Sequence, residues 1–205
     1  MRRMMPMGLA LAIIALGLTA QSAQRKLLLN VQPVPVAWAD GKLAEKLETS
    51  LSRNPDLQVV TCENEDEGFV KTLPPFPENR TDVEGLLDWG TEVGGRYLLV
   101  VTIYKEGMEK RKSFNLPLIF HKYENVGVIT GEFRLLDLQK RRLLAAEPFK
   151  TEITGARQYQ AEMDDNSSDP TLHVTASAKS RLFDDLEEKL TEQLVAKVAR
   201  LTRGR

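Results

Sequence analysis

The sequence has few of the residues on which metal binding and disulfide bonding depend. Its 205 residues include one cysteine, Cys62, and two histidines, His121 and His173. A lone cysteine excludes a disulfide within the chain, so the fold must rest on its apolar core, and we interpret Cys62 as a small buried hydrophobe. The histidines lie far apart and lack a metal-ligand neighbour at helical or hairpin spacing. We therefore expect no metal site.

The chain also lacks an excess of charge of either sign. Lys and Arg number 28 and Asp and Glu 29, which gives a formal net charge of −1. A dedicated nucleic-acid binder normally has a clear basic excess, so we expect no nucleic-acid partner. A content of 42% apolar and 28% charged residues excludes a disordered chain and an all-apolar membrane bundle.

Catalytic motifs are missing as well. There is no strand-turn-helix serine motif, no cysteine paired with a histidine in a known context, and no glycine-rich phosphate loop. Gly94 and Gly95 precede an apolar run that reads as a strand, so they offer no helix N-terminus to a phosphate. We expect a protein that is not an enzyme and that uses no cofactor.

The N-terminal segment has the composition of an export signal. Arg2 and Arg3 precede an aliphatic run over residues 8–18, and Ala20-Gln21-Ser22 supplies small residues for cleavage. We predict a signal peptide over residues 1–22, cleaved to leave one mildly acidic domain over residues 23–205. The alternative is a retained anchor, but the strongly apolar part is about half of the ~20 residues that spanning requires.

Lipid anchoring would need a cysteine directly after the apolar run, and the only cysteine is Cys62. We therefore expect a periplasmic or secreted protein without a lipid anchor.

The mature chain begins with a strand, a helix and a strand. Residues 26–36 are dense in Leu and Val and predict the first strand. Leu43, Leu47 and Leu51 recur every four residues among charged ones, which predicts a helix with one apolar stripe. Residues 57–62 predict the second strand.

A second helix and a central strand follow. The helix is expected to start near Asp82, to place Leu86 and Leu87 on its apolar side, and to stop at Gly94 and Gly95. Residues 96–103 form the most apolar strand of the mature chain, and continuous apolar character is typical of a strand buried on both faces. This strand should therefore be central.

The remaining pattern predicts hairpins and a long helix. Strands over 113–123, 127–138 and 143–154 should form an antiparallel meander with 96–103, and a helix over 176–201 carries a leucine-rich stripe. The predicted fold class is α+β. It has a mixed sheet, with β-α-β-α-β followed by an antiparallel meander and a long C-terminal helix packed on the sheet.

Two basic clusters fall in the first and third turns of this predicted meander. Such turns lie at the same end of a sheet, so six cations would share one surface. This surface could bind an anionic membrane surface or an acidic partner. The alternative is that exposed hairpin tips are simply basic and solvated. The cations are Lys110, Arg111, Lys112, Lys140, Arg141 and Arg142.

Residues 113–123 suggest a second binding element. Phe114, Leu116, Leu118 and Phe120 share one parity, so the hairpin is amphipathic, and Phe114 and Phe120 are candidate contacts with a partner or membrane. Pro117 and the charged flanks make a membrane-spanning strand short. The alternative function that this arm supports is a subunit of an oligomeric secretion channel or membrane-associated assembly.

Three segments carry a resemblance to a bacterial envelope domain family. They are residues 27–31, residues 88–99 and residues 131–138, whose strand ends in Asp137 before a turn. Together they resemble the family that includes the TolB N-terminal domain, LpoB and CsgG. The resemblance implies a non-catalytic module that recruits, activates or oligomerises in the periplasm. Its partners would be envelope proteins or an anionic membrane surface, or further copies of the chain.

The chain departs from this family in two ways. LpoB-like and CsgG-like proteins are lipid-anchored, and we expect no such anchor here. A TolB-like protein continues into a propeller, and we expect none to follow this domain.

Overall fold

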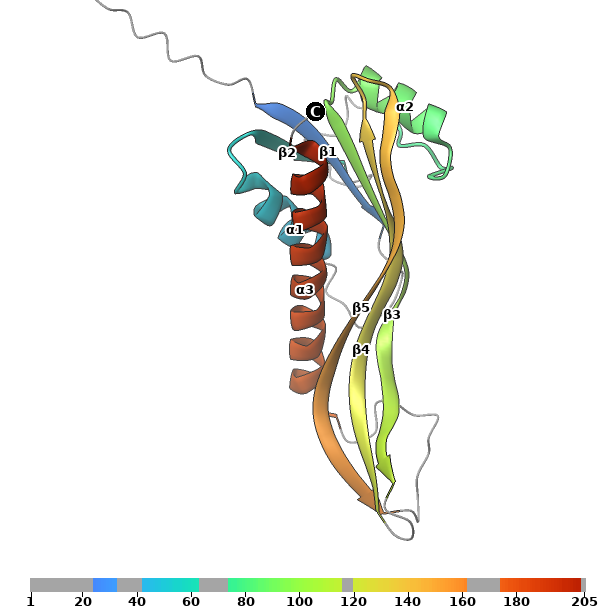
Figure 1. Ribbon diagram of the computed structural model, residues 1–205, viewed down its shortest axis with the longest axis vertical. Helices are drawn as coiled ribbons and strands as arrows, with labels where there is room; N and C mark the ends of the chain where they lie inside the picture. Colours follow the sequence, from blue (N-terminus) through green and yellow to red (C-terminus); the bar gives the residue numbers. More distant parts are fainter. Residues whose placement is uncertain (1–23, 33–41, 63–73, 116–119, 162–173, 204–205) are drawn as a thin grey trace, which may run out of the picture.

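The computed structural model describes residues 24–32, 42–62, 74–115, 120–161 and 174–203, which form a five-stranded mixed sheet and three helices (Figure 1). The predicted fold class is confirmed. The strands are β1 (Arg25–Gln32), β2 (Leu57–Thr61), β3 (Tyr97–Asn115), β4 (Phe120–Asp137) and β5 (Arg142–Ala161). The helices are α1 (Leu43–Ser52), α2 (Val83–Glu92) and α3 (Ala176–Thr202).

The sheet joins a parallel half to an antiparallel half. Its strand order is β2-β1-β3-β4-β5, with β1 parallel to both β2 and β3, and with antiparallel pairing from β3 to β4 and from β4 to β5. The predicted central strand is confirmed, because β3 lies in the middle of this order. The apolar start of β3 is where the two halves meet.

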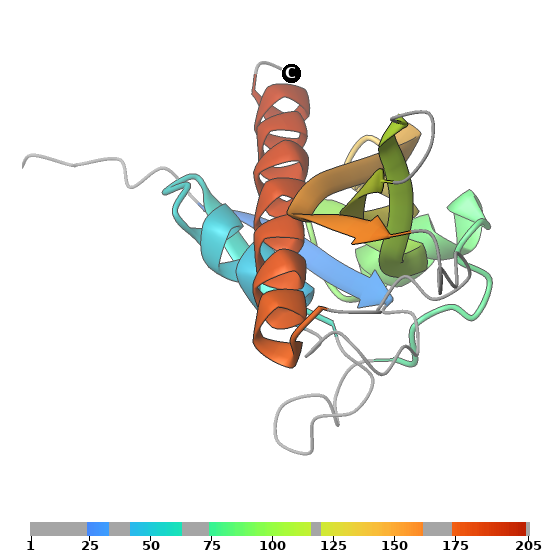
Figure 2. The same ribbon diagram turned by 90° about the horizontal axis from the view of Figure 1, so that it is seen from below.

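Helices cover both faces of the sheet. Figure 2 shows α1 and α3 on one side and α2 on the other. Because side chains alternate along a strand, Leu27 and Leu29 of β1 pack toward α1 and α3, whereas Leu28 packs in the cluster with α2. Cys62 belongs to the α2 cluster and is buried, as predicted.

Helix α3 docks on the sheet along its whole leucine stripe, which confirms the predicted contact. Each fully buried side chain of this kind contributes ~1.5–3 kcal/mol. Gly127 of β4 permits the close approach, since a Cβ there would lie 3.1 Å from Leu182 and 3.2 Å from Leu186. None of the helices in the described segments is long and apolar enough to cross a membrane. The stripe consists of Leu182, Leu186, Leu190, Leu194 and Val198.

The first turn of the predicted meander, between the strands expected over 96–103 and 113–123, is wrong, because residues 104–112 continue β3 instead. The strand predicted over 113–123 is wrong as well, because its residues belong to the end of β3 and the start of β4. The four predicted strands of the meander are therefore three long ones. Ion pairs within β3 and across β4 to β5 stabilise this charged run in its extended form. Arg111 lies 2.8 Å from Glu152 of β5 and 3.1 Å from Glu109, which in turn pairs with Lys105 at 2.8 Å.

Strands β3, β4 and β5 extend beyond the rest of the sheet. β1 pairs with β3 only as far as Thr102, and beyond it β3, β4 and β5 continue as a twisted ribbon past the start of α3 (Figure 1). Strand β5 forms one edge of the sheet. Along it, Pro148 has no backbone N–H, and the carbonyl of Glu152 accepts a hydrogen bond from Lys189 of α3 at 2.9 Å.

Candidate functional site

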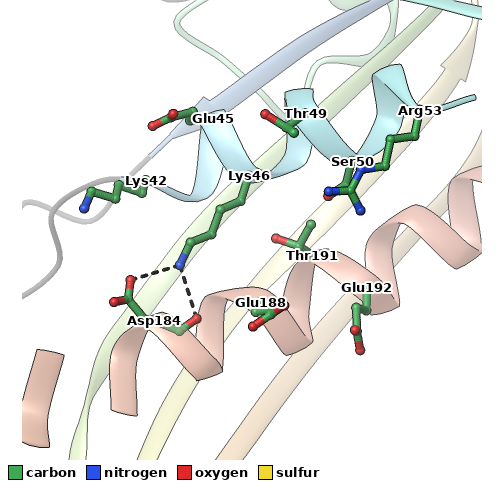
Figure 3. Close-up of a pocket in the computed structure, with 10 residues that line it drawn as sticks. All are labelled: Lys42, Glu45, Lys46, Thr49, Ser50, Arg53, Asp184, Glu188, Thr191 and Glu192. Carbon is green, nitrogen blue, oxygen red and sulfur yellow. Dashed lines mark hydrogen bonds and ion pairs between the residues drawn. The ribbon is translucent and has the colours of Figure 1, made fainter. Parts of the chain in front are cut away.

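A groove of about 480 Å³ lies between α1 and α3 (Figure 3). From α1 and its two ends it is lined by Lys42, Glu45, Lys46, Thr49, Ser50 and Arg53. From α3 it is lined by Asp184, Glu188, Thr191 and Glu192. The residues that line it are therefore all charged or hydroxyl-bearing, although both helices bury a leucine stripe directly beside it.

The groove follows from how the two helices dock. Each turns its leucines toward the sheet, which brings the polar residues beside those stripes to face one another. On α3, Asp184, Glu188 and Glu192 recur every four residues, so they form one acidic line along the groove.

An ion pair joins the two helices at the floor of the groove. Lys46 Nζ donates to Glu187 Oε2 at 2.7 Å and lies 3.2 Å from Asp184 Oδ1. The Glu187 residue is only 4% exposed. Burial acts to lower the pKa of Lys46, but its hydrogen bonds to these two carboxylates outweigh burial and raise it. Lys46 is therefore held in its charged form.

A further carboxyl lies close to this pair. Glu106 of β3 has its Oε1 atom buried and without a hydrogen-bond partner among the described residues. Burial, together with the charge of Glu187, raises the pKa of Glu106 to about 7 against the opposing effect of Lys46. One lysine thus faces three acidic groups, so the two carboxylates paired with Lys46 already exceed its charge by one and ionisation of Glu106 adds a second negative charge.

The α3 wall also has unused hydrogen-bonding capacity. Thr191 is 4% exposed, and its Oγ1 atom has no partner in the described part of the chain. Glu188 and Glu192 flank it on the exposed side and form no ion pair with any described residue. In Figure 3 the Thr191 side chain lies between the two helices. The wall therefore offers acceptors that nothing described occupies.

Cys62 lies in the α2 cluster on the other face of the sheet and contributes nothing to the groove. Burial raises the pKa of Cys62 to about 11, so near neutral pH its thiol is protonated and a poor nucleophile. In the ranges that the structure describes, no three His, Cys, Asp or Glu side chains are grouped so that they could hold a metal ion. What the groove provides is charge and hydrogen-bond acceptors at a surface.

The two predicted basic clusters do not share an end of the sheet, so that expectation is wrong. Residues 110–112 lie inside β3, whereas Lys140 and Arg141 form the turn after β4 and Arg142 opens β5. Tyr97, at the start of β3, pairs with Asp137 beside that turn, and Lys110 lies 13 residues farther along β3. That separation is roughly 40 Å. The missing turn at 104–112 is the cause, because without it the two clusters fall at opposite parts of the strands.

Two of the predicted site arginines are engaged within the chain. Arg111 forms the ion pairs of β3 described above, and its hydrogen bonds with Glu152 and Glu109 raise its pKa. Arg141 pairs with Asp88 of α2 at 2.8 Å and with Glu84 at 3.2 Å, and a hydrogen bond to Asp88 raises its pKa. Both therefore stabilise local structure.

The other predicted site residues are placed by backbone position. Lys112 pairs in register with Tyr123, Phe114 with Lys122, and Phe120 with Ala161, so all three lie toward the far end of the ribbon. A role for these residues in contacting a partner or membrane stays a prediction.

The groove itself was not predicted from the sequence. The signal was the pair of polar residues that directly follow buried leucines, Glu187 after Leu186 and Thr191 after Leu190. On one helix alone they look like the ordinary border of an apolar stripe. Only the position of α1 shows that the border is buried.

The scan of protein-family models and the search of curated proteins matched nothing. Among solved structures, the chain is similar to a minor lipoprotein from Acinetobacter baumannii, with 13% identity, a TM-score of 0.41, and coverage of 86% of this chain and 93% of that one. It is similar to a homologue of neuraminyllactose-binding hemagglutinin from Helicobacter pylori, with 8% identity, a TM-score of 0.49 and 86% of each chain covered.

A likeness to TolB from Acinetobacter baumannii covers 63% of this chain and 24% of that one, with 16% identity and a TM-score of 0.34. These likenesses concern the course of the chain, and no residue role follows from them. Membership of the envelope family suggested by the sequence stays a prediction.

Proposed function

We propose that this protein is an exported, non-catalytic interaction module of the bacterial cell envelope that holds a segment of a protein partner in the α1–α3 groove. The observation that carries the proposal is the groove wall on α3. It combines the buried hydroxyl of Thr191 with the carboxylates of Glu188 and Glu192, and none of the three is paired with another described residue. A buried polar group without a partner costs free energy, which a bound partner would recover.

Export is supported by the composition of residues 1–22, which lie outside the described residues. Mass spectrometry of the protein from a periplasmic fraction tests it. A mature N-terminus at Ala23 or Gln24 supports export with cleavage. An intact N-terminus in a membrane fraction would instead show a retained anchor.

Site-specific photo-crosslinking in the producing cell tests the groove. A photoreactive side chain at Thr49, which is exposed and lines the groove, should give one defined adduct with a second polypeptide. The same group at the exposed Ala146 of β5 should not give it. Glu188→Lys should abolish the adduct at Thr49. An adduct that appears from both positions, or that survives this charge reversal, contradicts the proposed site.

A second candidate function is a subunit of an oligomeric secretion channel or membrane-associated assembly. The observation that favours it is the three-stranded ribbon, which carries Phe114 and Phe120 past the start of α3. Size-exclusion chromatography with light scattering separates the two functions. A ring of many subunits supports the assembly, whereas a monomer or dimer rejects it.

A further inference from the structure

Several segments of the chain meet at one end of the sheet. Because β1 is parallel to β2 and β3, these three strands start at the same end, and the turn between β4 and β5 lies there too. Helix α2 ends beside β1, where Lys26 Nζ donates to the Val93 carbonyl at 3.0 Å. Helix α3 also ends there, and Arg25 Nη1 donates to the Thr202 carbonyl at 3.2 Å. In Figure 1 this end of the sheet is at the top.

Cations outnumber carboxylates where these segments meet. Leaving out Arg141, which is paired with two carboxylates of α2, six cations stand against Glu92 and Asp137, a surplus of four positive charges. Arg53 and Asp56, in the turn before β2, add one charge of each sign. The C-termini of the three helices carry roughly −0.5 each, which is less than the surplus. We call this surface the basic end, and its six cations are Arg25, Lys26, Arg96, Lys140, Arg142 and Arg203.

Most cations of the basic end are not matched by a carboxylate within the described chain. Arg25 and Lys26 donate to main-chain carbonyls, which carry no net charge. Lys140, Arg142 and Arg203 form no ion pair with another described residue. Arg25, Lys140 and Arg203 are also exposed. Their charge is therefore available to an anionic surface.

The basic end also contains a shallow hollow of about 400 Å³. Arg25, Lys26 and Arg96 line it beside the two glycines that precede β3, and no acidic residue of the described chain is among its lining. Arg96 lies 3.8 Å from Asp137, a buried carboxylate. The hollow is therefore a recess with positive charge around it.

The position of the basic end relative to the N-terminal segment points to a membrane. Gln24 lines the hollow, and the aliphatic run over residues 8–18 ends only six residues before it. Six residues span at most about 20 Å when fully extended. While that run lies in a membrane, before cleavage or as a retained anchor, the basic end is thus held within about 20 Å of the bilayer.

We infer that the basic end docks on a bilayer that contains anionic lipids, with lipid phosphates against its cations. Lys and Arg side chains near such a surface each strengthen binding, and the attraction falls off within a Debye length. This docking surface goes beyond the proposed function, because it uses none of the groove residues on α3. Docking would also leave the far end of the ribbon directed away from the bilayer (Figure 1).

The test is co-sedimentation of the purified protein with vesicles of two compositions. One contains phosphatidylglycerol and phosphatidylcholine in equal parts, and the other contains phosphatidylcholine alone. The protein should bind the anionic vesicles more tightly, and the difference should shrink as salt is added. A retained apolar segment would bind both compositions alike, so the difference between them reports charge. Equal binding to both, or no binding to the anionic vesicles at low salt, would overturn the inference.

Neutralising variants locate the docking surface. Lys140→Gln removes one exposed cation and should weaken binding to the anionic vesicles by about fivefold. Arg25→Gln/Lys140→Gln should weaken it by about 25-fold, because the two charges act independently. The matched control is Arg181→Gln, an exposed position 21 residues before Thr202 on α3, or about 30 Å away, and it should bind as the parent does.

A thermal melt of each variant separates lost binding from lost folding. The single variant Lys140→Gln breaks no ion pair with a described residue, so it should keep the parental melting temperature. Equal weakening in Lys140→Gln and Arg181→Gln, or no weakening in Lys140→Gln, would overturn the inference.

A fluorescent label tests the orientation on the vesicle. Cys62 is buried, so an environment-sensitive fluorophore can be attached selectively at Gln139→Cys, beside the hollow, or at Asp185→Cys, an exposed position near the start of α3. Anionic vesicles should shift the emission of the first label to shorter wavelength and leave the second unchanged. Equal shifts at both positions, or a shift at Asp185→Cys alone, would overturn the inference.

Discussion

The two faces of the sheet differ in whether certain buried polar groups have hydrogen-bond partners. On the α2 face, Asn30 is buried, but its amide donates to the Cys62 carbonyl at 2.7 Å and its oxygen accepts from Arg80. On the α1 and α3 face, Glu106 and Thr191 each bury an oxygen with no partner in the described residues. Both faces share the same strands, and the partners of Asn30 come from the segments that follow β2 and precede α2.

The difference separates the α2 face, where buried polar groups are paired and stabilise the fold, from the α1 and α3 face, where some buried polar groups are unpaired among the described residues. On the α2 face the hydrogen-bonded Asn30 lies in a compact apolar cluster, so this part of the face is a structural core. The opposite face combines a larger core with a polar border that is not fully paired. Unpaired buried groups lower stability, so their retention is typical of a surface with a second task.

The largest expected effect is on the larger core. Leu186→Asp should prevent folding, because Leu186 is fully buried under α3 and an unpaired charge there costs far more than the lost burial. Circular dichroism and a thermal melt measure the outcome. Ala196→Asp, at an exposed position of the same helix, is the control and should keep a normal melt. A folded Leu186→Asp variant would show that α3 does not depend on this stripe.

A smaller loss is expected on the α2 face from Trp89→Ala. Trp89 is 5% exposed and packs edge-on against the Phe76 ring, with the two ring centroids 4.7 Å apart. Its Nε1 donates a hydrogen bond to the Pro74 carbonyl at 2.9 Å. Removing the indole should lower the free energy of unfolding by about 3–5 kcal/mol. Urea denaturation measures the loss. Trp89→Phe keeps a ring and should lose clearly less, and equal losses would show that ring packing is not what stabilises this face.

The pH dependence of stability should separate the two faces. The pKa of Glu106 is about 7 in the folded chain, above its usual value of 4.5, so the folded state holds this proton more tightly than the unfolded state. Its contribution is therefore most favourable at low pH and is lost as the pH rises from about 4.5 to about 7. Glu106→Gln should abolish that loss and raise the melting temperature at about pH 8 relative to the parent.

Glu109→Gln serves as the control on the same strand. Hydrogen bonds from Lys105 and Arg111 lower the pKa of Glu109, so its titration has the opposite sign. This variant should retain the loss of stability between about pH 4.5 and 7. If Glu106→Gln and the parent lose stability in parallel over that range, Glu106 is not the titrating group.

The smallest effect is expected from Arg141→Gln. Arg141 pairs with Glu84 and Asp88 at the surface, and exposed ion pairs of this kind contribute little. The melting temperature should change only slightly, and the difference should disappear at high salt. A large, salt-independent drop would mean that the turn after β4 is as important to folding as either core.

Much of the fold could be predicted because periodicity marks it directly. The stripes of α1 and α3 recur every four residues, and the apolar start of β3 identifies the central strand. Residues 104–112 could not be assigned in the same way. They read as a charged turn because their stabilising partner, Glu152, lies 41 residues beyond Arg111.

The site was harder to predict than the fold, since it exists only where two helices meet. Lys46 and Glu187 are 141 residues apart, and neither segment alone shows that the pair is held at a floor between helices. Glu106 falls in a run that also contains Lys105 and Glu109, so nothing local distinguishes its buried carboxyl from exposed neighbours.

The edge strand β5 has a consequence for how the protein behaves when it is concentrated. A free sheet edge can template the addition of another chain, which leads to aggregation. A strand added to β5 would find no donor at Pro148, and four residues later it would find the Glu152 carbonyl already bound by Lys189. A continuous ladder of hydrogen bonds cannot form across that stretch. The long strand that builds the ribbon is thereby protected in its middle against edge-to-edge growth.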